Sequence, residues 1–479
     1  MNKVHGNKIA IYIFIVFAIV AVAVAGYMLY DGTSDTREKS EIQADPTIYS
    51  CPDCNVVFIS IDTLSAKHLG CYGYFRNTTP FIDELSAESL LFKNAYTNSP
   101  NTMISHASII TSHSPLSHGA IVPYGRHDGK PIPYGVKTMA EYYQENGFNT
   151  FGLTAHPGWL NNEYGFSRGM NEFLAIDENA EEHNKIVFKW LDTNNSSKFF
   201  LFLHYYDVHS DFKDFPYVTY TKYDEAFTNE YSGSFTGCYN GSCASDYLAQ
   251  LDRGVVPPLV TEDINYLTAR YDGQIPYVDE QIKQLIEKLN AVGVYDKTLI
   301  VITADHGEEL AEHGGYLHNK IYEEIAHVPL IMHFPNGIGR TEDALVESLD
   351  ILPTVLDFSD INYSDVQGTS LIRGEIPAKK IYSGYCFSGQ TCPTLSVRNE
   401  TTTVYSKDLK SFGVYSRVDD IGEHNNLIAE YLPPKHYADE FRGYIDEQLE
   451  LNRKIEDSSV LVKASNETIE KLKKLGYVT

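Results

Sequence analysis

The chain has 479 residues, of which 43% are hydrophobic and 13% are aromatic. This length suits one large domain or two to three ordinary ones, and the composition excludes bulk disorder. The formal net charge is −26, which argues against nucleic-acid binding because a polyanion meets repulsion instead of releasing counterions.

The first predicted element is a single-pass membrane anchor over residues 9–30, which carry no charged side chain. A helix of that length, with a rise of about 1.5 Å per residue, spans roughly 33 Å and crosses a bilayer. Lys3 and Lys8 precede it, so the positive-inside rule leaves residues 1–8 in the cytoplasm and the remaining chain outside the cell membrane. The alternative is a cleaved signal peptide, because residues 21–26 read AVAVAG. Residues 31–50 are polar and are predicted to be a tether.

Seven cysteines fit an exported protein. Six lie in close pairs, for which we expect local disulfides: Cys51/Cys54, Cys238/Cys243 and Cys386/Cys392. Cys71 is left over and is expected to be a buried thiol. The alternative is a zinc site at Cys51 and Cys54, which needs a second ligand pair of suitable spacing. Glycosylation sequons, which are permitted outside the cell, begin at Asn77, Asn194, Asn195, Asn240, Asn362, Asn399 and Asn466.

Continuous apolar runs predict buried strands at residues 55–61, 198–204, 298–303 and 327–333. Helical patterns cover residues 138–146, 262–292 and 349–358. Strands that alternate with helices predict an α/β fold with a large, mostly parallel central sheet flanked by helices.

Two regions depart from this pattern. Residues 211–258 are rich in Tyr, Asp, Gly and Ser and are predicted to be an insertion that lies over the site. Shorter strand-like runs at 395–398, 402–406 and 412–415, followed by a helix at 465–475, predict a smaller antiparallel C-terminal subdomain over residues 368–479. The catalytic domain then covers residues 51–367.

Acidic and imidazole side chains stand where the predicted strands end. Asp62 ends the first strand, His209 follows the second, and Asp305 with His306 ends the third. Ligands of an open parallel sheet bind beyond the carboxyl ends of its strands, so we expect these groups to converge. Oxygen and nitrogen ligands of this kind suit one divalent cation: Mn, Mg, Ca or Zn. Taken singly, an Asp after a strand is also a common helix cap.

Several segments carry a specific resemblance. Residues 57–74, VFISIDTLSAKHLGCYGY, look like the opening metal-binding motif of sulfatases. Residues 304–314, 317–330, 348–357, 368–371 and 422–427 resemble later landmarks of the same family, in family order. The chain therefore resembles the sulfatase family of the alkaline phosphatase superfamily from residue 55 to about 430. The resemblance implies an alkaline-phosphatase-like fold and hydrolysis of sulfate or phosphate esters.

The nucleophile position departs from the family pattern. Sulfatases that use formylglycine carry Cys or Ser in a Cys-x-Pro-Ser-Arg type motif, where this chain has Thr102, Ile104 and His106. A threonine cannot supply formylglycine, so the resemblance shifts toward superfamily members with a Thr nucleophile; the alternative is that Thr102 caps the following helix. Thr63 replaces the second of two adjacent acids, which implies a single metal held by Asp62, Thr102, Asp305 and His306.

The resemblance also implies roles for histidines. It makes His209 and His318 candidates for a catalytic acid or a substrate-oxygen contact. Apart from the resemblance, His106 is a candidate for orienting Thr102, and His156 is a weaker candidate. Other side chains are expected to be structural or solvated: His113, His118 and His313 in packing or helix termination, Glu308, Glu309 and Glu312 on the solvated face of a helix after His306, and Lys320 at the surface.

The predicted function is metal-dependent hydrolysis of a sulfate or phosphate ester through Thr102. A bound cation lowers the pKa of the threonine hydroxyl, and an imidazole supplies the proton that the leaving alkoxide needs. The expected partners are the membrane and a sulfated or phosphorylated small molecule, glycan or lipid head group. Two alternatives remain: a phosphoglycerol or phosphoethanolamine transferase acting on surface glycans or lipids, and a surface binding protein without turnover.

Overall fold

A computed structural model describes residues 49–121, 128–155, 158–210, 216–217, 221–228, 231–233, 235–239, 242–386, 392–431, 433–455 and 462–463. The predicted anchor, nearly all of the tether, His156 and the predicted helix at 465–475 lie outside these residues. Among the described helices, none combines the length and the apolar character that a membrane span requires.

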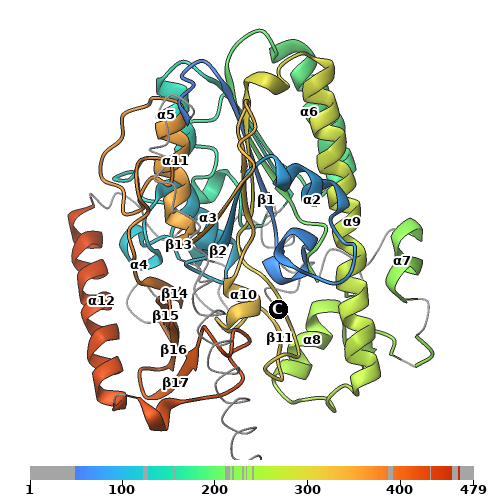
Figure 1. The fold of residues 1–479 in the computed structure, drawn as a ribbon, viewed down its shortest axis with the longest axis vertical. Helices are drawn as coiled ribbons and strands as arrows, with labels where there is room; N and C mark the ends of the chain where they lie inside the picture. The colour runs from blue at the N-terminus through green and yellow to red at the C-terminus, as the bar shows by residue number, and fades with distance from the viewer. Residues whose placement is uncertain are drawn as a thin grey trace, which may run out of the picture. The chain divides into compact units, whose positions relative to one another are not determined.

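An eight-stranded sheet forms the centre of the fold, in the order β13-β2-β12-β9-β1-β6-β4-β5 (Figure 1). The central strand β1 runs parallel to both neighbours, β6 and β9, and all three are fully buried. The strands are β1 (Asn55–Ile61), β2 (Leu90–Tyr96), β4 (Asn149–Thr154), β5 (Glu172–Ala175), β6 (Phe199–Tyr205), β9 (Thr298–Ala304), β12 (Leu330–His333) and β13 (Arg340–Glu347).

Helices cover both faces of this sheet. Figure 1 shows α2, α6 and α9 on one side and α3, α5 and α11 on the other. Their bounds are α2 (Pro80–Ala87), α3 (Thr102–Thr111), α4 (Pro115–His118), α5 (Met139–Glu145), α6 (Ala180–Asn194), α9 (Thr261–Ala291), α10 (Glu323–Ala326) and α11 (Ile351–Phe358). The start of α5 is fixed by a capping box in which Thr138 and Glu141 satisfy each other's backbone N–H.

The predicted insertion contributes α7 (Thr221–Thr228), a hairpin of β7 (Cys238–Tyr239) and β8 (Ser242–Cys243), and α8 (Ala244–Asp252). A second short hairpin, β10 (Glu309–Leu310) with β11 (Tyr316–Leu317), follows β9. Single turns of 3-10 helix lie at Ala66–His68, Gly70–Tyr72, Asn162–Tyr164, Tyr295–Lys297, Ser348–Asp350 and Ile428–Glu430.

The C-terminal region forms the expected antiparallel sheet, with four strands covered by the helix α12 (Pro434–Lys454). The strands are β14 (Ile381–Tyr385), β15 (Thr394–Arg398), β16 (Thr402–Lys407) and β17 (Ser411–Ser416). A further short pair joins β3 (Asp128–Gly129) to β18 (Val462–Lys463).

The cysteine prediction is confirmed. Disulfides join Cys51 to Cys54, Cys238 to Cys243 and Cys386 to Cys392. Cys71 is free and partly buried, and burial, assisted by the negative charge of Asp83, raises the pKa of its thiol to about 12. The zinc alternative is thereby wrong, since both sulfurs of the first pair are used in a disulfide.

Candidate active site

The first acidic group of the site leaves the sheet at the end of β1. Asp62 is fully buried, and its Oδ2 lies 3.1 Å from Nε2 of His204, a residue of the neighbouring strand β6. The next residue, Thr63, has a φ of 56°, in the left-handed region that β-branched residues rarely adopt. Its N–H donates to Oδ1 of Asp305 over 3.2 Å, which joins the ends of β1 and β9.

Asp305 and His306 face each other at the end of β9. His306 Nδ1 lies 3.0 Å from the Gly307 carbonyl, and because a carbonyl only accepts, this nitrogen carries the ring hydrogen. Burial lowers the pKa of His306 to about 4, so the ring is neutral near pH 7 and Nε2 presents a lone pair. His306 Nε2 lies 3.3 Å from Asp305 Oδ2, and neither of these two buried atoms has a hydrogen-bond partner.

These atoms fit a divalent cation. Two electron-rich atoms at 3.3 Å repel each other unless positive charge stands beside them, and carboxylate oxygen and neutral imidazole are common metal ligands. One ligand atom from each of Asp62, Asp305 and His306 lies within 4.8 Å of the others. The structure therefore brings three of the four predicted metal ligands together with the chemistry that a cation requires.

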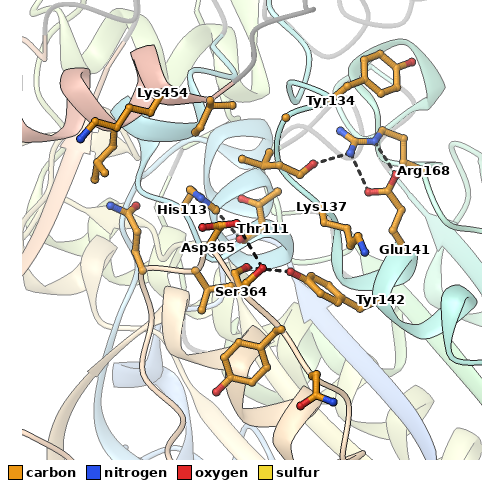
Figure 2. A pocket seen from close by; sticks show the side chains of 18 residues that line it. Thr111, His113, Tyr134, Lys137, Glu141, Tyr142, Arg168, Ser364, Asp365 and Lys454 are labelled. Carbon is orange, nitrogen blue, oxygen red and sulfur yellow. Dashed lines mark hydrogen bonds and ion pairs between the residues drawn. The ribbon is translucent and has the colours of Figure 1, made fainter.

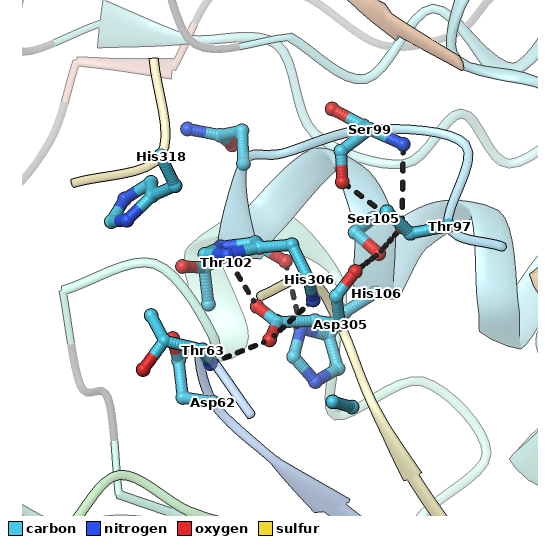
Figure 3. Close-up of polar contacts among 12 residues, drawn as sticks. Asp62, Thr63, Thr97, Ser99, Thr102, Ser105, His106, Asp305, His306 and His318 are labelled. Atoms are coloured by element: carbon cyan, nitrogen blue, oxygen red, sulfur yellow. Dashed lines mark hydrogen bonds and ion pairs between the residues drawn. The ribbon is translucent and has the colours of Figure 1, made fainter. Parts of the chain in front are cut away.

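Thr102 is buried and is the first residue of α3. The helix is capped by Asn101, whose side chain accepts from the N–H of Ile104 over 3.2 Å. The alternative role of Thr102 as the cap is therefore wrong. The first turn of α3 is held against the end of β9, because Ser105 Oγ donates to the Asp305 carbonyl over 2.7 Å. Figure 3 shows Thr102 beside Asp305 and His306.

His106 contacts Thr102 through the backbone. Its Nδ1 donates to the Thr102 carbonyl over 2.7 Å, and its Nε2 lies 2.9 Å from Ser60 Oγ. Burial lowers the pKa of His106, so it is a neutral ring that accepts from the serine hydroxyl. The ring lies 3.7 Å from Asp305 Oδ2. This geometry suits a side chain that positions the first turn of α3.

The two remaining histidine candidates lie together. The ring of His318 is 4.4 Å from that of His306 and 5.3 Å from that of His209, measured between centroids. His209 is buried and stacks on Tyr206 at 4.4 Å. His318 thus lies next to the candidate metal ligand His306, on the side where Thr102 lies in Figure 3, and His209 lies beside His318.

The prediction of a solvated helix after His306 is wrong. Glu308 and Glu309 are fully buried, Glu312 is half-buried, and the chain enters the β10–β11 hairpin. Gly307 packs so closely on the backbone of residue 324 that a Cβ would stand 2.1 Å from the Glu324 carbonyl oxygen, so the chain after His306 lies against other backbone and not in solvent. Glu309 pairs with Lys320 over 2.9 Å, so this lysine is a half-buried ion-pair partner and not simply a surface charge.

Glu308 has two partners in the site. It accepts from His318 Nδ1 over 2.8 Å and from the Tyr217 hydroxyl over 2.6 Å. Burial alone raises the pKa of a carboxyl group, but His318 and His209 outweigh it and hold the pKa of Glu308 below its ordinary value. Tyr217 belongs to the predicted insertion, so this segment does reach the site.

A second group of acids and imidazole does not suit a cation. Glu309, His313 and Glu324 also place ligand atoms within 4.8 Å. However, His313 bonds to the Glu324 carboxylate over 2.8 Å and to the Glu423 carbonyl over 3.0 Å, so both ring nitrogens donate and the ring is positively charged. Together with Lys320, this ring already balances the two carboxylates.

His113 and His118 make structural contacts, in line with the sequence expectation. His118 accepts from the N–H of Ala120 over 2.9 Å and bonds to Ser108 Oγ over 3.1 Å at the end of α4. His113 bonds to the Thr111 carbonyl over 2.7 Å. Near His113 a cavity of about 910 Å³ opens at the far end of α3 (Figure 2), and none of the metal-ligand residues lines it.

Sequence reasoning missed His204, Glu308 and Tyr217 as residues of the site. His204 carried a usable signal, because a histidine inside an otherwise apolar buried strand needs a polar partner. The sequence around Tyr217 gives no such signal, because its hydrogen-bond partner Glu308 lies 91 positions away in the chain.

Comparison with known proteins places this geometry in a family. Residues 54–361 match the family model described as Sulfatase. The chain belongs to the sulfatase family. Residues 311–439 match a second family model, described as N-sulphoglucosamine sulphohydrolase, C-terminal. The prediction of a sulfatase-family hydrolase acting on ester bonds is thereby confirmed.

Individual relatives agree with the family assignment. An arylsulfatase of Clostridium perfringens is 26% identical over 381 residues, which cover 66% of this chain and 77% of that protein. An N-acetylglucosamine-6-O-sulfatase of Bacteroides thetaiotaomicron is 31% identical over 212 residues, or 40% of this chain and 38% of that protein.

Solved structures confirm the predicted fold. A phosphonate monoester hydrolase of Agrobacterium radiobacter is similar with a TM-score of 0.64 at 17% identity, covering 86% of this chain and all of that one. A 2-O GAG sulfatase gives a TM-score of 0.65 at 19% identity, with 87% and 96% coverage. At these identities the likeness concerns the fold alone.

Proposed function

We propose that this sulfatase-family chain is a divalent-metal-dependent hydrolase of sulfate esters in which Thr102 is the nucleophile. The observation that carries the proposal is the pair of unsatisfied, buried atoms Asp305 Oδ2 and His306 Nε2, with the first turn of α3 anchored against the same aspartate. Relatives that act on sulfate esters, among them the arylsulfatase of Clostridium perfringens, support sulfate as the transferred group.

Asp62, Asp305 and His306 would hold the cation, with the Thr102 hydroxyl as a further ligand. A bound divalent cation lowers the pKa of a neighbouring alcohol and stabilises negative charge on the oxygens of a sulfate group. The start of α3 adds the positive end of its helix dipole, which favours an anion in front of Thr102. These features suit attack of the Thr102 oxygen on the sulfur atom of the ester.

Two histidines then serve proton transfer and orientation. His318 is the proposed acid that gives a proton to the departing alkoxide, and it later accepts a proton from the water that releases the sulfo group from Thr102. His209, with its ring 5.3 Å from that of His318, is the proposed contact for a sulfate oxygen. His106 positions Thr102 through the carbonyl of that residue.

A covalent intermediate tests the nucleophile. After brief incubation with an aryl sulfate, we expect intact-protein mass spectrometry to show one added sulfo group, located on Thr102 by fragmentation. Thr102→Ala should lose this adduct and about a thousand-fold or more of the turnover. Thr102→Ser keeps a hydroxyl and is the matched control, for which the adduct should persist. Full turnover by Thr102→Ala would contradict the proposal.

A substrate panel tests the transferred group and the acceptor. We expect turnover of an aryl sulfate to exceed that of a bis-aryl phosphate and of a phosphonate monoester. Greater turnover of either phosphorus ester would shift the assignment to phosphoester hydrolysis. Products carrying the group on an added alcohol would favour the transferase alternative, and absence of turnover on the whole panel would favour the binding protein.

We further propose that the enzyme works outside the cell, attached by residues 9–30. The three disulfides support an oxidising compartment. Protease treatment of intact cells is expected to degrade the catalytic domain, and carbonate washing is expected to leave the chain in the membrane fraction. Release of a shortened chain into the medium would indicate signal-peptide cleavage instead.

A further inference from the structure

Beside the candidate metal ligands lies a buried carboxylate, that of Glu308, with two hydrogen-bond partners. It is fully buried, and its two oxygens have different partners: Oε2 lies 2.8 Å from His318 Nδ1 and Oε1 lies 2.6 Å from the Tyr217 hydroxyl. Burying a carboxylate costs several kcal/mol unless hydrogen bonds compensate it. The hydrogen bonds from His318 and Tyr217 therefore compensate the burial of the Glu308 carboxylate.

The partners fix the direction of each hydrogen bond. A carboxylate oxygen accepts, so the tyrosine hydroxyl donates and Nδ1 of His318 carries a hydrogen. Nε2 is then the ring nitrogen that is available to a substrate. The His318 ring stands 4.4 Å from that of His306, next to the ligand group where the ester would bind.

Tyr217 is itself held in place. It is fully buried, and its ring makes an edge contact with Tyr271 at 5.4 Å between centroids. Tyr271 in turn donates to the Thr63 carbonyl over 2.6 Å. The residues that hold His318 are thus packed against the turn that follows Asp62, which fixes the imidazole relative to the metal-ligand group.

We propose that Glu308, held by Tyr217, is a positioning residue that sets the hydrogen of His318 on Nδ1 and points Nε2 at the leaving oxygen of the ester. This inference rests on the proposed function, in which His318 is the acid. When the S–O bond to the leaving group breaks, its electron pair stays on the leaving oxygen. The proton on Nε2 moves to that oxygen, and the neutral ring keeps its Nδ1 hydrogen bonded to Glu308.

The two reactions in the test differ in their need for a proton. A nitrophenolate leaves readily as an anion, whereas an alkoxide or an unsubstituted phenolate leaves slowly without protonation. A group that acts only through the acid therefore affects the second kind of ester and spares the first. A group that merely supports the fold affects both alike.

Glu308→Gln is the informative variant. The Tyr217 hydroxyl still donates, so it retains the Gln oxygen and turns the Gln amide NH₂ toward Nδ1 of His318. The ring hydrogen must then move to Nε2, as happens when an amide replaces the carboxylate beside a catalytic histidine. Glu309→Gln is the matched control, because Glu309 is equally buried but pairs with Lys320.

We expect Glu308→Gln to lower kcat/KM for an alkyl or phenyl sulfate by about a hundred-fold to ten-thousand-fold, and for nitrophenyl sulfate by less than about ten-fold. Tyr217→Phe should show the same selectivity with a smaller loss. Glu309→Gln should change all esters by one common factor. An equal loss on every ester in Glu308→Gln and Tyr217→Phe would overturn the inference.

A second measurement does not depend on turnover. In protein with ¹⁵N-labelled histidine, the His318 signals, assigned by their absence in His318→Gln, should report hydrogen on Nδ1 in the wild type and on Nε2 in Glu308→Gln. An unchanged tautomer would overturn the positioning role. Failure of the proposed function shows differently: Thr102→Ala would then retain turnover, whatever the tautomer of His318.

Discussion

The two carboxylate oxygens of Asp305 have unlike surroundings. Oδ1 accepts from the backbone N–H groups of Thr63 and His306 over 3.2 and 2.9 Å. Oδ2 has no hydrogen-bond partner and faces a ring nitrogen that carries no hydrogen. One oxygen therefore holds the turn in place, and the other has the surroundings that a cation ligand requires.

Cation binding should raise the thermal stability of the protein. A chelator-treated wild type should gain several degrees in Tm on addition of Mn, Mg, Ca or Zn at about a hundred times Kd, because a ligand that binds only the folded state then contributes about 2.7 kcal/mol. Asp305→Ala should lose this shift, which differential scanning fluorimetry would measure. Asp279→Asn changes a buried carboxyl group that accepts from the first N–H groups of α2 and is not one of the candidate ligands, so this variant should keep the shift. A metal-induced shift of normal size in Asp305→Ala would contradict the assignment.

At the level of single residues, the rule that ligands gather at strand ends located Asp62, Asp305 and His306 from the sequence. The same reasoning assigned Glu308 to a solvated face, and there it failed. The burial of Glu308 depends on a backbone contact between Gly307 and residue 324 and on a tyrosine from a distant insertion. No local pattern encodes contacts of that kind.

Helix α9 supports the turn that follows Asp62. The Tyr271 hydroxyl from this helix accepts from the N–H of Ser65 over 3.0 Å and donates to the carbonyl of Thr63. Thr63 is held in a left-handed conformation, which costs a β-branched residue of the order of 1–3 kcal/mol. The helix thereby holds a strained turn that presents Asp62.

Tyr271→Phe should release this turn. Losing both hydrogen bonds, with a buried N–H left unpaired, should lower the free energy of unfolding by about 2–3 kcal/mol and weaken cation binding, as urea denaturation and metal titration would show. Tyr143→Phe is the matched control, because its buried hydroxyl also makes two hydrogen bonds, to Val355 and Ser359. It should lose similar stability with unchanged metal affinity.

A double variant tests whether strain at Thr63 is the cause. Adding Thr63→Gly to Tyr271→Phe should restore part of the metal affinity, since glycine adopts a positive φ without strain. No restoration would contradict strain as the cause.

The elements that sequence predicted well are those whose burial is complete. The runs at β1, β6 and β9 are mostly apolar and fully buried, and the sequence predicts their ends to within one residue. The edge strand β13, with the sequence RTEDALVE, carries too many polar residues to show a strand pattern. β12 runs antiparallel to β9, because the connection between them has only a hairpin and the single turn α10, and no crossover helix long enough to return the chain in parallel.

At the scale of the whole molecule, buried histidines make the free energy of unfolding depend on pH. His118 is fully enclosed between α3 and α4, where burial, followed by the charge of His113, lowers its pKa to about 3. An unfolded histidine has a pKa of about 6.5, so the unfolded chain takes up a proton that the folded chain refuses. The stabilising contribution is complete above about pH 6.5 and declines as the pH falls toward 3.

His118→Gln should therefore flatten the acid response. Between pH 7 and pH 5 the free energy of unfolding of the wild type should fall by about 2 kcal/mol more than that of the variant, as urea denaturation at each pH would measure. His436→Gln, at an exposed position, should leave the wild-type slope unchanged. Parallel slopes for the wild type and His118→Gln would show that this histidine does not couple the fold to pH.

The candidate cation ligands and the tyrosine that supports the proposed proton donor come from separate segments of the chain. Strand ends of the central sheet supply Asp62, Asp305 and His306, whereas Tyr217 belongs to segment 211–258. A change at Tyr217 alone would therefore alter the proposed proton transfer to the leaving alcohol without removing a candidate cation ligand. Because Tyr217, Tyr247 and Leu248 of the same segment pack into the main hydrophobic core, this segment contributes to the stability of the fold as well as to the support of the proposed proton donor.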